Sequence, residues 1–259
     1  KRAVITGPTG SIGIALINEL EANGIEVVAV VRPGSKRADR IKESSLVKCV
    51  KCDLSNLDKL PELIPDGADV FYHFGWDGTF GDSRNNMKGQ NLNVKYALDA
   101  VEAASKLGCK TFVGAGSQAE YGRFEGKLNG STPTFPENGY GIAKLCAGQM
   151  TRIMCQQKGI KHIWTRILSI YGPYDGEKTM VMSTIDRLLK GEVPSCTKGE
   201  QMWDFLYSKD AALAMRLLGE KGIDGKIYCI GSGQARPLKE YINIMGESID
   251  STIQIGFGD

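Results

Sequence analysis

The chain opens with a short apolar segment that ends in three closely spaced glycines. Residues 3–6 are Ala-Val-Ile-Thr, and Gly7, Gly10 and Gly13 follow, ahead of a segment with helical periodicity. A strand that enters such a turn lets the backbone approach a pyrophosphate, and the free N–H groups of the next helix face that charge. The sequence therefore predicts a phosphate-binding strand, turn and helix, which is typical of open α/β folds.

Strands and helices alternate along the rest of the chain, without an internal repeat. The apolar segments predict strands over residues 3–6, 26–31, 47–51, 70–74, 111–115, 162–168 and 226–230. Amphipathic segments predict helices at about 12–23, 57–64, 87–107, 141–157, 181–190, 209–219 and 238–248. Most strands are continuously apolar, as expected when helices cover both faces of a parallel sheet. We therefore predict an α/β fold with a doubly wound parallel sheet, of the Rossmann type.

The chain length predicts two unequal parts. A chain of 259 residues can form one large α/β domain and a smaller lobe. We expect residues 1–170 to form the dinucleotide-binding domain, joined by the strand near 226–231, and residues 171–259 to form mainly a substrate-binding lobe. The segment 123–139, rich in Gly, Pro, Ser and Thr, predicts a long functional loop. Residues 256–259 lack a clear helix end, so we expect C-terminal sequence beyond them.

Composition excludes several classes of partner. The net charge is +2, and the basic residues do not cluster apart from Lys36, Arg37 and Arg40, so we expect no nucleic acid partner. Because no run of about eighteen apolar residues and no leader occur, we expect no membrane span, no signal peptide and a cytoplasmic protein. Seven scattered cysteines predict reduced thiols, and Cys49 and Cys52 are expected to be structural, with no metal site.

A second motif lies far downstream of the glycines. Tyr140 and Lys144 are four residues apart in a predicted helix and so share one face. Together with the glycine turn, this motif resembles the short-chain dehydrogenase/reductase superfamily, in its extended, sugar-nucleotide-modifying branch, the NAD-dependent epimerase/dehydratase family. The resemblance covers essentially the whole chain and is densest over residues 3–173. It implies a sugar-nucleotide substrate and a homodimer formed through the helices predicted over 87–107 and 141–157.

The resemblance implies three catalytic roles. A phenol has a pKa of about 10 and is a poor acid or base at neutral pH until a cation favours its ionised form. Lys144, one helical turn from Tyr140, can supply that field and bind the nicotinamide ribose. Ser117 ends the fifth predicted strand, where the family places a hydroxyl that binds the substrate carbonyl. We expect Tyr140 to act as general acid or base, Lys144 to tune it and Ser117 to anchor the carbonyl.

The residues after the second predicted strand favour NADP(H). NAD-preferring members of such folds place Asp or Glu there, whereas this chain has Val31, followed by Arg32, Lys36 and Arg37. A carboxylate would repel a 2′-phosphate, while guanidinium and ammonium groups hold one through charge-assisted hydrogen bonds. The alternative is that these basic residues form only a solvated turn, and NAD then stays possible as the cofactor.

Further cofactor-binding residues are implied by the family's positions. They are Gly7, Thr9, Gly10, Ser11, Ile12 and Gly13 in the turn, Asp53 and Leu54 beside adenine, Phe74, Gly75 and Trp76 after the fourth strand, and Asn93 in the next helix, besides Tyr140 and Lys144. Asp53 has a structural alternative, because it can cap the next helix, although Ser55 or Asn56 suits that position better. His73, inside the fourth strand, is expected to be a core histidine.

The residues after the fifth strand separate the reactions within the family. Related 4,6-dehydratases carry Thr-Asp-Glu there as acid and base, and the aligned residues here are Ser117, Gln118 and Ala119. Since Gln and Ala transfer no proton, elimination is disfavoured, and Glu120 is expected to point elsewhere. NADPH-linked reduction of a nucleoside diphosphate 4-keto-6-deoxyhexose is favoured by the basic turn. The alternatives are a 4-epimerase with tightly bound NAD and a catalytically silent NADP-binding sensor.

The substrate side departs from the family's pattern at two positions. Residues 166–173 resemble the family's Arg-x-x-Asn-x-Tyr-Gly-Pro, with Ser169 in place of the Asn. Trp203 stands where the family usually has an Arg that binds the diphosphate. Because an indole cannot neutralise phosphate, either Arg187 or Lys198 does so, or the substrate is not a typical nucleoside diphosphate. We expect the substrate to contact Gln118, Ser169, Arg187 and Trp203, although Trp203 can equally be a core residue.

Overall fold

A seven-stranded parallel sheet forms the centre of the computed structural model, which describes residues 1–194 and 196–258. The strands are β1 (Arg2–Thr6), β2 (Glu26–Val31), β3 (Val47–Lys51), β4 (Val70–His73), β5 (Thr111–Ser117), β6 (Lys161–Ile167) and β10 (Ile227–Ile230). Their order in the sheet is β10-β6-β5-β4-β1-β2-β3. This is the predicted doubly wound sheet, and β10 pairs with β6 at its edge. Asp259, at the end of the segment 256–259, lies outside the described residues.

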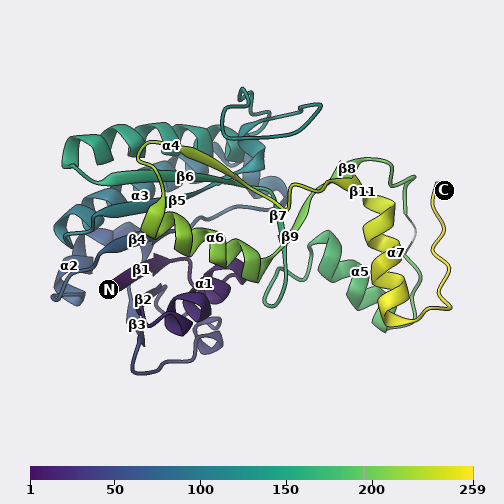
Figure 1. Ribbon diagram of the computed structural model, residues 1–259, viewed down its shortest axis with the longest axis horizontal. Coiled ribbons are helices and arrows are strands. Elements are labelled where there is room, and N and C mark those ends of the chain that lie inside the picture. Colours follow the sequence, from purple (N-terminus) through teal and green to yellow (C-terminus); the bar gives the residue numbers. More distant parts are fainter. Residues whose placement is uncertain (195, 259) are drawn as a thin grey trace.

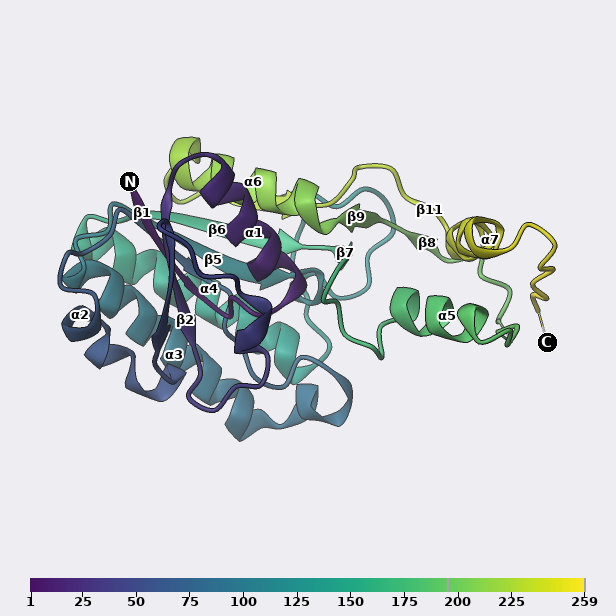
Figure 2. The same cartoon turned by 90° about the horizontal axis from the view of Figure 1, so that it is seen from below.

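Helices cover both faces of this sheet. α3 (Met87–Lys106) and α4 (Gly139–Lys158) pack together on one face, and α1 (Ser11–Ala22) and α6 (Ser208–Lys221) pack on the other (Figures 1 and 2). Because water reaches neither face, every residue of β2 after Glu26 is buried. Among the described residues, no helix combines the length and the apolar character needed to cross a membrane.

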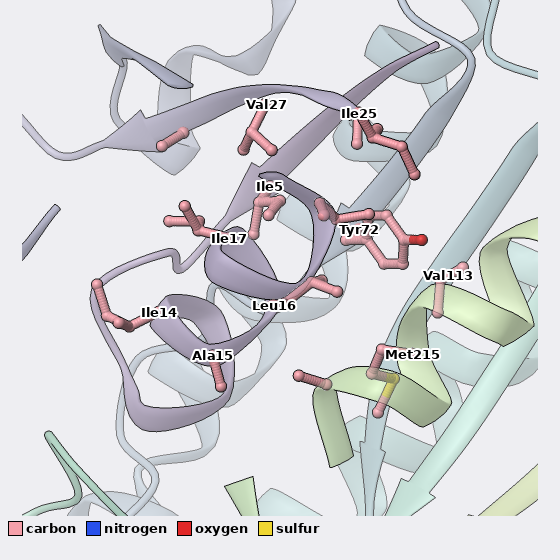
Figure 3. Close-up of a cluster of buried hydrophobic side chains, with 14 of the residues drawn as sticks. Ile5, Ile14, Ala15, Leu16, Ile17, Ile25, Val27, Tyr72, Val113 and Met215 are labelled. Carbon is pink, nitrogen blue, oxygen red and sulfur yellow. The ribbon is translucent and has the colours of Figure 1, made fainter. Parts of the chain in front are cut away.

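The side chains of β1 alternate between two apolar clusters. Ile5 of β1 faces α1 and contacts the cluster that contains Leu16 and Ile17, which Met215 of α6 joins (Figure 3). Its neighbour Val4 faces the opposite cluster, under α3. This alternation follows from the two-residue period of a strand, and it fixes the position of β1 and its following turn between two packed layers.

The helix predicted over residues 57–64 differs from the structure. A 3-10 helix spans Leu54–Lys59, and a short helix α2 spans Leu60–Leu63. Pro61 explains the difference, because it has no N–H to donate to the carbonyl of Leu57 and its ring clashes with that turn. A proline fits only in the first turn of a helix, so α2 starts at Leu60.

The chain beyond β6 builds a smaller group of elements past the carboxyl edge of the sheet (Figure 1). β7 (Ser169–Tyr171) pairs in parallel with β9 (Phe205–Tyr207), and β8 (Met202–Trp203) pairs antiparallel with β11 (Arg236–Pro237). Two helices, α5 (Met180–Leu189) and α7 (Leu238–Ile249), pack against each other here. Since ligands bind outside the carboxyl ends of strands in open α/β sheets, these elements flank the expected site.

Candidate active site

The turn between β1 and α1 is tightly packed against the chain after β4. Gly7 has a φ of +68°, and a Cβ there would lie 2.7 Å from the backbone nitrogen of Gly75. A Cβ at Gly13 would lie 2.7 Å from the carbonyl oxygen of Gly7. The Oγ of Ser11, in the first turn of α1, is buried and has no partner among the described residues. Free N–H groups and an unpartnered hydroxyl at a helix N-terminus fit a phosphate group.

A cavity of about 570 Å³ extends from this turn past the ends of β2 and β3. Its lining includes Gly7, Thr9, Arg32, Lys36, Arg37, Asp53, Leu54, Gly75 and Trp76, all of them predicted cofactor residues. No acidic residue follows β2 directly, because Val31 is succeeded by the basic turn. The cavity therefore has the dimensions and the polar lining that suit the adenosine half of a dinucleotide.

Asp53 has a structural role in this cavity as well. Its Oδ1 accepts hydrogen bonds from the backbone N of Ser55 at 3.0 Å and from the Oγ of Ser55 at 2.7 Å. These bonds, with Arg32 nearby, lower the pKa of the Asp53 carboxyl. Asp53 is therefore the cap of the following helix, and the expectation that Ser55 or Asn56 suits that position better was wrong, because Asp53 directly precedes the first turn.

A second cavity, of about 360 Å³, continues over the edge of the sheet. It shares Gly7 and Trp76 with the first cavity, so the two form a continuous groove. Its lining includes Gly10, Ser11, Ile12, Gly13, Phe74, Ser117, Tyr140 and Lys144. The structure thus brings the two sequence motifs, which are separated by more than half of the chain, to one wall.

Lys144 is held firmly on this wall. Its Nζ donates to the carbonyl oxygen of Ala115 at 2.7 Å and lies 5.7 Å from the ring centroid of Tyr140. The same Nζ lies 3.8 Å from the ring centroid of Trp76. Burial lowers the pKa of Lys144 to about 7, although Glu120 opposes this shift. The lysine therefore titrates near neutral pH instead of being a permanent cation.

Tyr140 lies between two further polar groups. Burial raises the pKa of its phenol, while the side chain of Ser117 and the charge of Arg84 act in the opposite direction. The guanidinium carbon of Arg84 lies 5.0 Å from the ring centroid of Tyr140. Sequence reasoning missed Arg84, which lies in a 3-10 helix over Gly81–Asn85 where no motif or periodicity marks it.

Asn93 lines neither of these two cavities, but it supports the segment that lines them. It is buried, its Oδ1 accepts from the backbone N of Asp77, and its Nδ2 donates to the carbonyl oxygen of the same residue. These bonds fix the segment after β4 that carries Trp76. His73 is a core histidine as expected, because its Nδ1 bonds to the Oγ1 of Thr6 and burial lowers its pKa to about 3.

A third cavity, of about 540 Å³, lies between the sheet edge and the elements after β6. Ser169 and Trp203 line it, and the Nε1 of Trp203 donates to the Oγ of Ser169 at 2.7 Å. The Nε2 of Gln118 reaches the same oxygen at 3.4 Å. Phe80, Leu168, Ile170 and Asp175 line both this cavity and the second one. A ligand in the third cavity would therefore extend towards Tyr140.

The expected cations are not at this cavity. Arg187 is exposed and pairs with Glu192 at 3.6 Å, and neither Arg187 nor Lys198 belongs to the lining. Arg187 lies on the exposed face of α5, so its contact with the substrate stays a prediction that the lining of this cavity does not support. Lys178 lines the cavity instead. It precedes α5 in a segment without periodicity, so no sequence signal marked it.

Glu120 points away from the groove, as expected. Its carboxylate is fully buried, accepts from the backbone N of Ser117 at 2.8 Å and pairs with the Nε of Arg166 at 2.9 Å. The indole Nε1 of Trp164 donates to it as well. Glu120 therefore holds the end of β5, which carries Ser117, instead of acting on a ligand.

Similar sequences are found among enzymes that act on sugar nucleotides. Over 256 residues the chain is 26% identical to the Arabidopsis thaliana trifunctional UDP-glucose 4,6-dehydratase/UDP-4-keto-6-deoxy-D-glucose 3,5-epimerase/UDP-4-keto-L-rhamnose-reductase, covering 93% of this chain and 38% of that protein. It is 28% identical over 245 residues to the dTDP-6-deoxy-L-talose 4-dehydrogenase (NAD(+)) of Aggregatibacter actinomycetemcomitans, covering 91% and 86% of the two chains.

Solved structures share the same fold. The UDP-glucose 4-epimerase of Thermotoga maritima, determined with UDP-glucose, superimposes with a TM-score of 0.85 at 21% identity, covering 99% of this chain and 85% of that one. Residues 3–231 match the model of the NAD dependent epimerase/dehydratase family. The chain belongs to this family, the sugar-nucleotide-modifying enzymes of the extended short-chain dehydrogenase/reductase type.

Proposed function

We propose that the chain catalyses the NADPH-linked reduction of a nucleoside diphosphate 4-keto-6-deoxyhexose. One observation carries this proposal: Ser117, Tyr140 and Lys144 line the same cavity as the glycine turn. When bound, a nicotinamide cofactor supplies the hydride that reduces the carbonyl carbon. The residues proposed below bind the reactants and move the proton.

Tyr140 is the proposed general acid. The carbonyl oxygen gains negative charge as the hydride arrives, and the phenol of Tyr140 donates a proton to it. The hydroxyl of Ser117 donates a hydrogen bond to the same oxygen and so stabilises its developing charge. Lys144, one helical turn away, adds to the local field when it is protonated and binds the nicotinamide ribose. The carboxylate of Glu120 is engaged by Arg166 and takes no part in this transfer.

NADP(H) is the proposed cofactor. Arg32, Ser35, Lys36 and Arg37 line the adenosine cavity, and together they offer cationic and hydroxyl donors for a 2′-phosphate. Isothermal titration calorimetry with NADP⁺ and NAD⁺ tests this assignment. We expect NADP⁺ to bind more tightly, and equal affinity for both would refute the role of the basic turn.

The substrate is proposed to occupy the third cavity, in the lobe formed mainly by residues 171–259. Ser169 and Trp203 line this cavity and share a hydrogen bond, and Lys178 lines it as a cation. Gln118 does not line it but donates to the same oxygen of Ser169. Arg187 has no part in this proposal. The name of the 4-dehydrogenase from Aggregatibacter supports a 6-deoxyhexose linked to a nucleoside diphosphate as the substrate class.

The deciding assay follows NADPH oxidation by absorbance with a panel of nucleoside diphosphate 4-keto-6-deoxyhexoses. We expect turnover with at least one member, and none with Tyr140→Phe. If no member of the panel were turned over, and a UDP-hexose were interconverted without net cofactor oxidation, the chain would be assigned to the 4-epimerases that retain NAD. A catalytically silent sensor is the least supported alternative, because Ser117, Tyr140 and Lys144 are all present at one cavity.

The chain is also proposed to form a homodimer through α3 and α4. Exposed apolar side chains lie on both helices: Met87 and Leu92 on α3, and Ile142, Met150 and Ile153 on α4. Sedimentation equilibrium of the chain and of Ile142→Glu tests this pairing. We expect a dimer for the first and a monomer for the second, and a monomer in both cases would refute it.

A further inference from the structure

We propose that Arg84 is the fixed positive charge that sets the ionisation of Tyr140, which makes it a positioning residue for the proton transfer. The inference rests on the proposed function in one respect, the use of Tyr140 as the proton donor. Neither of the two sequence motifs contains Arg84, which comes from the 3-10 helix before α3.

The geometry of Arg84 is that of a charge held against an aromatic ring. Its guanidinium carbon lies 5.0 Å from the ring centroid of Tyr140. Its Nε is buried and has no hydrogen-bond partner among the described residues. None of the ion pairs within residues 1–194 and 196–258 includes Arg84. Its charge is therefore not neutralised by a described carboxylate and acts on the nearby phenol.

The segment that carries Arg84 is anchored to the first turn of α4. The Oδ1 of Asn85 accepts a hydrogen bond from the backbone N of Gly139 at 3.0 Å. A Cβ at Gly139 would lie 2.9 Å from the carbonyl oxygen of Arg84. Since Tyr140 directly follows Gly139, these contacts fix the backbone of Arg84 relative to the backbone of Tyr140. The charge is thus in place before any ligand binds.

The other charged groups facing Tyr140 do not replace Arg84. Lys144, on the same helix, is bonded to Ala115 and lies against Trp76, and its pKa of about 7 leaves it only partly charged at neutral pH. Glu120, behind β5, raises the pKa of Tyr140, and the hydroxyl of Ser117 lowers it. A guanidinium keeps its charge at every pH that enzymes meet. Arg84 is therefore the cation near Tyr140 whose charge does not vary with pH.

Tyrosinate absorbance tests the proposal without requiring turnover. The tyrosinate absorbance is read directly after each rapid pH jump. Each protein is compared with a variant that also carries Tyr140→Phe, and subtracting the absorbance of that variant leaves the titration of Tyr140 alone. We expect Arg84→Gln to raise the midpoint by about one pH unit, because a cation at this distance favours the phenolate. Arg84→Lys, which keeps the charge, should restore most of the shift.

Asn85→Ala is the matched control, because it removes the bond to Gly139 and keeps the charge of Arg84. We expect it to move the Tyr140 midpoint less than Arg84→Gln does. A larger shift for Asn85→Ala than for Arg84→Gln would assign the effect to the backbone contact instead of the charge and overturn the proposal. So would an unmoved midpoint in Arg84→Gln, or no restoration by Arg84→Lys. A lack of reductase activity would overturn the proposed function. It would not change the measured titration of Tyr140 or what that titration says about Arg84.

Discussion

The ammonium of Lys144 lies 3.8 Å from the centroid of the Trp76 ring, and both residues line the second cavity. Trp76 is itself fixed, since its Nε1 donates to the Oε1 of Gln90 at 2.9 Å. The aromatic face attracts the charged lysine, yet burial still lowers the pKa of Lys144 to about 7. The groove therefore contains a lysine whose charge changes within the working range of most enzymes.

This depressed pKa predicts a pH-dependent stability. The pKa of Lys144 is about 7 in the fold and about 10.5 when unfolded, so between these values the unfolded chain binds more protons. The protein should thus gain stability relative to Lys144→Met by roughly 1.4 kcal/mol for each pH unit from 7 towards 10. Urea denaturation of both proteins across this range measures the difference. A difference that does not change with pH would show that Lys144 titrates normally.

Tyr140→Phe should remove catalysis and keep the fold. The substitution deletes one hydroxyl from a partly buried ring that still packs against Trp76. We expect kcat to fall by at least about a hundredfold, the usual contribution of a general acid, with NADPH affinity unchanged. Tyr228→Phe, on β10 at the far edge of the sheet, is the control and should retain full activity. A similar loss in both variants would argue against the role of Tyr140.

The sheet and one wall of the site could be predicted because their signals are local. Buried parallel strands are continuous apolar segments, so β2 was located from its own residues. The glycine turn and the spacing of Tyr140 and Lys144 are equally local, since each lies within one turn or one helix. The prediction over residues 57–64 was wrong because Pro61, which cannot continue a helix, was not weighed against the apolar spacing.

The remaining parts of the site depend on tertiary packing. Val181, Thr184 and Leu188 form the buried face of α5, which leaves Arg187 exposed. Sequence shows that such a face exists, but not which neighbour covers it, so it could not show that Arg187 lies outside the lining of the third cavity. Arg84 contacts the ring of Tyr140 from a short 3-10 helix, and Lys178 lines the third cavity from a turn, where no period predicts the direction of a side chain.

Arg32→Ala should weaken the binding of NADP⁺ selectively. A charge-assisted hydrogen bond to a phosphate contributes about 1.5 kcal/mol or more, so we expect at least about a tenfold loss of affinity. The affinity for NAD⁺, which lacks the 2′-phosphate, should not change. Arg123→Ala is the control, because Arg123 is another exposed arginine, and it pairs with Glu137 and does not line the adenosine cavity. If calorimetry found equal losses for NADP⁺ and NAD⁺, Arg32 would act on the shared part of the two cofactors.

Two glycines with the same backbone conformation allow the phosphate cradle to be tested. Gly7 and Gly24 have φ angles of +68° and +69°, but a Cβ at Gly24 has no atom within 4 Å, whereas at Gly7 it meets backbone atoms at 2.7 Å. Gly24→Ala should cost about 1–2 kcal/mol, the penalty of the left-handed conformation alone. Gly7→Ala should cost more and abolish cofactor binding, which denaturation and calorimetry measure. Equal stability and retained binding would contradict the close packing of the turn.

Breaking the ion pair between Glu120 and Arg166 should destabilise the fold far more than breaking a surface pair. Both side chains are almost fully buried, with 1% and 4% of their areas exposed. Glu120→Gln keeps the shape but leaves the guanidinium of Arg166 buried without a counter-charge, which should cost about 3–5 kcal/mol. Glu137→Gln breaks the exposed pair with Arg123 and should cost less than about 1 kcal/mol. Chemical denaturation compares the two variants. Because the amide oxygen of a glutamine can still accept from the backbone N of Ser117, kcat of the remaining folded protein should change little, and a large loss would mean that the charge of Glu120 is needed to hold Ser117.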